Sequence, residues 1–333
     1  MADLRTTITE VVTGLGMLGA DDLDHALAAR PDAIANVAPA VWDALARAWK
    51  EARHTDVFAA AFMNGRRFLD AQDALRCRIP LLVEWKGAHR SPGDEVVPAD
   101  LRVDHVYLVS CKYLSRIVVN ASPHHLFDRL LAGGQGRRGG DWFREVAPLE
   151  HAALYYAVRA EIKAVDLPAD MAALDATGRR ALGVALRDGW PDGAADLYHA
   201  LVERTALASA LRWQNAIDNA AAAPMLWRLL RIGSAPYFVL GASPRGFLRL
   251  RIATPWDWRR HFELRAFEVE ARAGGQPVVA WRAFVRDRDD RREHIVRGHV
   301  EVRWSHGRFG APPEAKVYLD TPHDEIPGYF PLR

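Results

Sequence analysis

The sequence predicts a mixed α/β protein in which helices flank a short run of strands and a β-rich region follows at the C-terminal end. Three observations predict this class. Apolar residues recur at helical spacing up to about residue 76 and again from 149 to 232, short apolar runs bounded by turn residues occupy 80–113, and apolar and polar residues alternate beyond 235. With 333 residues, of which 50% are hydrophobic, the chain can bury more than one core.

The first elements in the chain are helical. An N-terminal helical segment over residues 1–45 precedes a helix over 55–75, which carries Phe58, Phe62 and Leu69 on one side. Short strands are then expected over 81–86, 100–104 and 106–113.

A helix over 123–131 follows the strands. It begins with Ser122 as its N-cap and Pro123 in its first turn. His124 and His125 lack the spacing of a metal-binding pair on a helix, so they are expected at the surface of this helix start.

These patterns divide the chain into four parts. We expect an N-terminal helical segment (1–45), a core of strands and helices (46–160), a helical region (161–233) and a β-rich C-terminal domain (234–333). The alternation in the last part predicts an antiparallel sheet of five or six strands.

The composition excludes several classes of protein. Lys and Arg number 44 and Asp and Glu 42, so a uniformly basic nucleic-acid coat protein is not indicated. Cys77 and Cys111 are too few for a disulfide framework or a four-cysteine zinc site. No apolar run reaches the roughly 18–20 residues of a membrane span. We therefore expect a cytoplasmic protein with reduced thiols and no membrane partner. Motifs for a P-loop, a dinucleotide fold or a serine hydrolase elbow do not occur.

The residues that suggest chemistry lie between Glu84 and Lys112. Asp100 is followed after nine residues by Ser110-Cys111-Lys112, and residues two apart on a strand face the same way. If Asp100 lies on the partner strand and Glu84 on the next, carboxylates and an amine share one face of the sheet. Carboxylate oxygens are the ligands that Mg²⁺ prefers, and a lysine can orient an attacking water.

This arrangement resembles the PD-(D/E)XK nuclease superfamily, which has a restriction-endonuclease-like fold. The resemblance covers roughly residues 45–160 and implies an Mg²⁺- or Mn²⁺-dependent endonuclease acting on DNA, in restriction or phage defence. It implies that Asp100 and Glu84 hold the metal with Asp104 as a further ligand, and that Lys112 orients the water. Ser110 stands where the family has its second acid, so another carboxylate must supply that ligand, and Glu84 is favoured over Asp104 and Glu51.

Two other registers of the motif remain open. Asp73 followed by Glu84-Trp85-Lys86 gives an intact motif, although Asp73 lies at the end of a helical pattern. Glu314-Ala315-Lys316 with Glu301 upstream is a third, but no helix follows it.

Basic residues outside the motif predict contacts with the DNA backbone. Arg137 and Arg138 in a glycine-rich loop, together with Lys86, are assigned to phosphate binding. A second copy of the chain or a separate subunit is left open as a further partner.

The competing hypothesis is a catalytically silent nuclease fold that binds nucleic acid or protein. The position of Glu84 discriminates the two hypotheses: a carboxylate within metal-bridging reach of Asp100 favours the enzyme, and one turned elsewhere favours the binding module.

Overall fold

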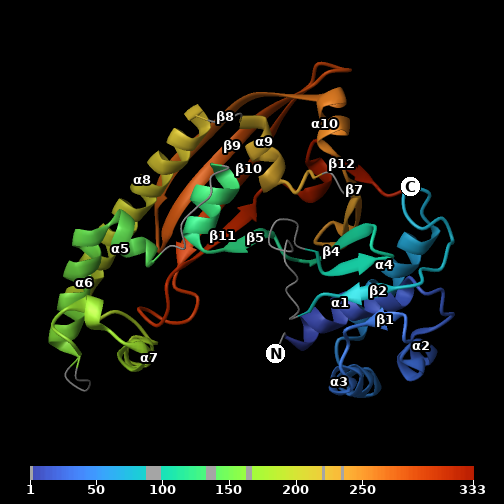
Figure 1. Cartoon of the computed structure of the whole chain (residues 1–333), viewed down its shortest axis with the longest axis horizontal. Helices are drawn as coiled ribbons and strands as arrows, with labels where there is room; N and C mark the ends of the chain where they lie inside the picture. The colour runs from blue at the N-terminus through green and yellow to red at the C-terminus, as the bar shows by residue number, and fades with distance from the viewer. Residues whose placement is uncertain (1–2, 88–98, 133–139, 163–166, 220–221, 234–235) are drawn as a thin grey trace. The chain divides into compact units, whose positions relative to one another are not determined.

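The computed structural model describes residues 3–87, 99–132, 140–162, 167–219, 222–233 and 236–333. The chain forms two compact units (Figure 1). The first combines residues 1–116, 231–262 and 322–333, and the second combines 117–230 and 263–321. Each unit contains helices and strands, so the fold is mixed α/β.

The first unit is built on a seven-stranded sheet with strand order β1-β2-β3-β4-β6-β7-β12. Strands β2, β3 and β4 form an antiparallel meander, and β6 then pairs parallel to β4. The strands are β1 (Ile34–Ala35), β2 (Val83–Trp85), β3 (Leu101–Val103), β4 (Tyr107–Tyr113), β6 (Tyr237–Ser243), β7 (Gly246–Ile252) and β12 (Tyr329–Pro331). The helices are α1 (Leu4–Gly16), α2 (Leu23–Ala29), α3 (Pro39–Lys50), α4 (Thr55–Asp70), α10 (Pro255–His261) and the short η4 (His323–Glu325).

Helices α1 and α4 cover one face of this sheet and bury its core. Val12 of α1 and Phe68 of α4 pack in one cluster with Val83, Leu101 and Val109 from three neighbouring strands. The odd-numbered residues of β2, β3 and β4 therefore face the helices, and the even-numbered residues face the opposite side.

The two helices approach closely because both carry glycine at their crossing. A Cβ on Gly65 would overlap the main-chain oxygen of Thr13, and one on Gly16 would overlap that of Phe62. Only glycine leaves room for this contact.

The second unit is built on a five-stranded sheet with strand order β5-β11-β10-β9-β8. Its strands are β5 (Ile117–Ala121), β8 (Phe262–Ala273, whose first residue belongs to the first unit), β9 (Pro277–Asp287), β10 (Glu293–Arg303) and β11 (Glu314–Leu319). Its helices are η1 (His125–Leu131), α5 (Trp142–Val146), α6 (Pro148–Glu161), η2 (Met171–Ala173), α7 (Ala176–Ala185), η3 (Asp192–Ala194), α8 (Ala195–Asn219) and α9 (Ala222–Leu229). The long helix α8 packs along the sheet, where Trp213 contacts Phe267.

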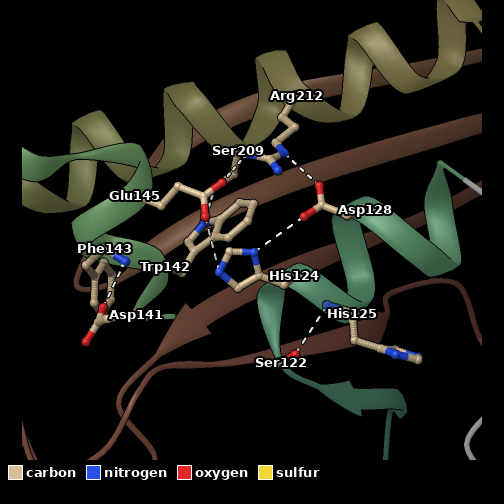
Figure 2. A network of polar contacts seen from close by, with 10 residues as sticks. All are labelled: Ser122, His124, His125, Asp128, Asp141, Trp142, Phe143, Glu145, Ser209 and Arg212. Carbon is tan, nitrogen blue, oxygen red and sulfur yellow. Dashed lines mark hydrogen bonds and ion pairs between the residues drawn. The ribbon is translucent and has the colours of Figure 1, made fainter. Parts of the chain in front are cut away.

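A charged network joins η1, α5 and α8 inside the second unit (Figure 2). Arg212 donates hydrogen bonds to Asp128 at 2.7 Å and to Glu145 at 2.6 Å, and its guanidinium lies 5.0 Å from the ring centre of Trp142. His124 lies between the same two carboxylates, 3.4 Å from each. The expected surface position of His124 is wrong, because this side chain is buried within the network.

Several predicted elements correspond to observed ones. The helix predicted over 55–75 is α4, which ends at Asp70, and the three predicted strands are β2, β3 and β4. The helix predicted over 123–131 is η1, which is π-helical. The C-terminal region differs: β6, β7 and β12 join the first sheet, and only β8–β11 form the second sheet, with β5.

The observed units also have other limits than the four predicted segments. The segments 1–45, 46–160, 161–233 and 234–333 each contribute to a unit that is discontinuous in the sequence. The parallel pairing of β4 with β6 causes this difference, since it brings the residues on both sides of segment 117–230 into one sheet. Within the described part of the chain, every helix is too short or too polar to cross a lipid bilayer.

Replacing Gly65 by alanine tests the helix crossing. We expect Gly65→Ala to lower the free energy of unfolding by about 3 kcal/mol, because the added methyl forces α1 and α4 apart. Gly274→Ala is the matched control, since a Cβ there has open space around it. Thermal and urea unfolding check the result, and equal stability of the two variants would contradict the close crossing.

Candidate functional site

Three of the predicted site residues, Glu84, Ser110 and Lys112, lie on the sheet face opposite α1 and α4. Glu84 pairs in register with Arg102, and Arg102 pairs with Leu108. Side chains alternate along a strand, so Ser110 and Lys112 share this face with Glu84. The expectation that these residues share one side of the sheet agrees with this register.

The carboxylate of Asp100 contacts Ser110, where it serves as a hydrogen-bond acceptor at the start of β3. Its Oδ2 atom accepts a hydrogen bond from the main-chain N–H of Cys111 at 2.6 Å and from the hydroxyl of Ser110 at 3.1 Å. The carboxylate thereby continues the β3–β4 ladder one step before Leu101, the first residue of β3. Because one oxygen accepts both hydrogen bonds, this carboxylate satisfies polar groups of β4 and has a structural role.

Glu84 is held by cations from the neighbouring strand and the turn after it. Arg102 donates to both of its oxygens, at 2.5 Å and 2.7 Å, and the ring of His105 lies 3.2 Å away. The bidentate bond from Arg102 lowers the pKa of Glu84 below its usual value. A metal at this carboxylate would have to displace a guanidinium, so the residues present do not fit the implied magnesium site.

Asp104 has a structural role in the turn after β3. Its backbone has a positive φ of 48°, and its Oδ1 atom accepts the main-chain N–H groups of Leu81 and Leu82 at 2.8 Å and 3.0 Å. Its other oxygen accepts from Arg78 at 2.7 Å. The geometry gives no support to Asp104 as a metal ligand, because its oxygens hold the segment before β2.

Lys112 is half-buried rather than open to solvent. Its charge contributes, after burial, to lowering the pKa of His323 in η4 to about 4. Lys86 begins the turn after β2, and its main-chain N–H donates to the carbonyl of Asp100 at 2.9 Å. Arg137 and Arg138 lie outside the described residues.

The described residues do not form a metal site in any of the three registers. Throughout those parts of the chain, no group of three or more His, Cys, Asp or Glu side chains is placed to hold a metal ion. In the second register, Asp73 accepts the main-chain N–H of Arg333 at 3.2 Å. In the third register, Glu314 lies 3.7 Å from Lys316, and Glu301 is paired with Arg303 at 3.3 Å.

A different site stands out in the second unit. A pocket of about 1110 Å³, which we call the arginine pocket, is lined by α7, the start of α8, the β8–β9 turn and the segment that follows β10. Its charged lining consists only of cations and histidines: Arg179, Arg180, Arg187, Arg303, Arg308, Lys316, His199 and His306. Asp and Glu side chains are absent from the lining that the structure describes.

The cations of the arginine pocket fall into two groups. Arg303 and Lys316 have acidic partners, and Arg179 and Arg308 donate to main-chain carbonyls, including those of Phe309 and Leu186. Arg180 and Arg187, on and just after α7, have no acidic partner among the described residues and are exposed. These two guanidiniums are therefore available to an external anion.

Aromatic rings line the same pocket. Trp190 stacks on Tyr198 with ring centres 4.7 Å apart, and the guanidinium of Arg308 lies 4.9 Å from the Trp190 ring centre. Both rings are only half-buried. Cations beside partly exposed aromatic faces can bind phosphates and stack bases.

The sequence motifs gave no sign of this pocket because its residues come from distant segments. The signal that was present is the pair Arg179-Arg180 followed by Arg187, which places three arginines on and just after one helix. A comparison with models of known families, with curated proteins and with solved structures finds no match.

The pair of Glu84 and Arg102 predicts a pH-dependent contribution to stability. The folded pKa of Glu84 is lowered, so its contribution is present above the unfolded pKa and is lost as the pH falls through the folded pKa. We expect Glu84→Gln to cost about 1–2 kcal/mol at pH 7, and the difference from the wild type to shrink below about pH 4.5. Unfolding measured from pH 3 to 7 checks this, with Glu263→Gln at an exposed pair as control. A pH-independent difference would contradict the ion pair.

Proposed function

We propose that the chain is a binding protein for single-stranded DNA and that the arginine pocket is its binding site. The observation that carries this proposal is a lining with cations, aromatic rings and no acidic side chain among the described residues. A site for a neutral or cationic ligand would not gather this many guanidiniums, because they repel one another without an anion.

The size of the pocket leaves room for a segment of a polymer. Small-molecule pockets usually have about 300–1,000 Å³, and the arginine pocket has about 1110 Å³. Aromatic faces beside the cations favour a single strand, whose bases can stack, over a duplex, whose bases are already stacked. Trp190 and Tyr198 supply such faces.

The position of Glu84 also supports binding over hydrolysis. Its two oxygens are bound by Arg102, and Asp104 is used by the main chain of Leu81 and Leu82. This favours the hypothesis of a nuclease-like fold that binds without cleaving.

A metal-dependent DNA endonuclease is the second candidate function. It is favoured by the antiparallel meander β2-β3-β4 with β6 parallel to β4, which fits the helix and strand order of the restriction-endonuclease-like core. It is also favoured by Asp100, Ser110 and Lys112 on neighbouring strands. Residues 117–230 of the second unit lie between β4 and β6, and its residues 263–321 lie between β7 and β12, so the resemblance would cover a discontinuous core.

Removing two guanidiniums of the arginine pocket tests the binding function. We expect Arg180→Ala with Arg187→Ala to weaken binding of a dT20 oligonucleotide about 30-fold, from two phosphate contacts of roughly 1 kcal/mol each. The slope of log affinity against log salt should become shallower by about 1.4, at roughly 0.7 per contact on a single strand. Fluorescence anisotropy at several salt concentrations measures both quantities.

The matched control removes two cations at a different place in the second unit. Arg265→Ala with Arg272→Ala changes the net charge equally, but these exposed arginines on β8 are paired with Glu263 and Glu270. We expect this control to bind like the wild type. An equal loss in both double variants, or no binding by the wild type at low salt, would refute the assignment.

Plasmid cleavage separates the two candidate functions. Because Glu84 is bound by Arg102, we expect plasmid DNA to stay intact when the wild type is incubated with Mg²⁺ or Mn²⁺. Lys112→Ala and Asp100→Ala are run beside it. Metal-dependent cleavage by the wild type that falls at least 100-fold in Lys112→Ala would instead establish the nuclease and its site.

A further inference from the structure

A second, smaller pocket borders the arginine pocket within the second unit. It has a volume of about 410 Å³, and its lining includes Asp141, Arg144, Glu145, His151 and Arg179. Arg179 also lines the arginine pocket, so one guanidinium serves both cavities. We call the smaller cavity the His151 pocket.

His151 is the unusual residue of this pocket. Its side chain is buried, with 2% of its surface exposed, and its ring stacks on Phe309 at 5.4 Å between ring centres. Neither ring nitrogen has a hydrogen-bond partner among the described residues. Burial lowers the pKa of His151, so near neutral pH the ring presents one donor and one acceptor.

Leaving both nitrogens unpaired is unfavourable for the protein alone. A buried donor or acceptor without a partner is destabilising, and aromatic neighbours such as Phe143 and Phe309 would accept a phenylalanine here. A histidine at this place is explained if a ligand in the pocket provides the missing partners.

The remaining lining fits a planar heterocycle with both donors and acceptors. Leu174 and Phe309 provide apolar walls. Glu145 is already held by Arg212, and Oδ1 of Asp141 accepts from the main-chain N–H of Phe143. The other oxygen of Asp141 can accept from N–H groups, and the guanidinium of Arg144 can donate to ring acceptors. Guanine carries two adjacent N–H donors on one edge, and its O6 and N7 atoms form the acceptor pair that arginine binds bidentately.

We infer that the His151 pocket binds the guanine base of a nucleotide whose phosphate lies against Arg179 in the adjoining arginine pocket. This inference rests on the proposed function, because the arginine pocket supplies the phosphate site. It adds a base preference to a site that would otherwise bind single strands without regard to sequence.

The preference is measured with two kinds of probe. The first is dT20 compared with the same oligonucleotide carrying one central guanine or one central adenine. The second is dGMP compared with dAMP and dTMP by calorimetry. We expect the wild type to bind the guanine-containing oligonucleotide about tenfold tighter than dT20, and dGMP more tightly than the other two nucleotides.

Two variants remove the groups that would read the base. His151→Phe deletes both ring nitrogens and keeps an aromatic ring against Phe309. Arg144→Ala removes an exposed guanidinium, which leaves the core unchanged. Each is expected to bring the guanine preference to within about twofold of unity, while affinity for dT20 stays as in the wild type. His294→Phe on β10, which does not line the pocket, is the control and should keep the preference.

The outcomes separate this inference from the proposed function. Binding of dT20 without a guanine preference, or a preference that survives in both variants, would overturn the inference and keep the DNA-binding function. Binding of dGMP without binding of dT20 would support the base site and overturn the single-strand function. Binding of neither probe would overturn both.

Discussion

The first unit depends on the buried amide of Asn64, which joins a helix to strands that are remote in sequence. Its Nδ2 atom donates to the hydroxyl of Tyr113 and to the carbonyl of Gly241, both at 2.9 Å, and its Oδ1 accepts from Arg249 at 2.8 Å. Asn64 on α4 thereby connects β4, β6 and β7, and it is fully buried. An amide has the donors and the acceptor to satisfy all three groups, which an apolar residue could not do.

The pairing of β4 with β6 that this amide supports also sets the chain's organisation. Gly241 faces Lys112 across the pair, and a Cβ there would overlap the lysine's carbonyl, so glycine allows the strands to meet. The sequence predicts the local elements well, since α4, β2, β3 and β4 follow from spacing and turn residues. It does not predict the limits of the units, because parallel pairing across residues 117–230 leaves no local pattern.

The candidate sites also differ in how far the sequence predicts them. The shared face of Glu84, Ser110 and Lys112 follows from strand alternation and could be predicted. The hydrogen bonds that occupy both oxygens of Glu84 come from Arg102, its neighbour on the adjacent strand. The sequence alone does not fix the register of these two strands, so this pairing could not be predicted. The arginine pocket and the His151 pocket combine segments from α5 to the loop after β10, so only the folded chain brings their residues together.

The central claim is that the second unit, through the arginine pocket, contacts single-stranded DNA. Hydrogen exchange of the full chain with and without an oligonucleotide tests it most directly, because it locates the contact without altering a residue. The account predicts slower exchange of main-chain amides in α7 and in residues 303–310, with those of β2, β3 and β4 unchanged. Protection confined to β2, β3 and β4 would contradict it and would place the DNA at Asp100 and Lys112.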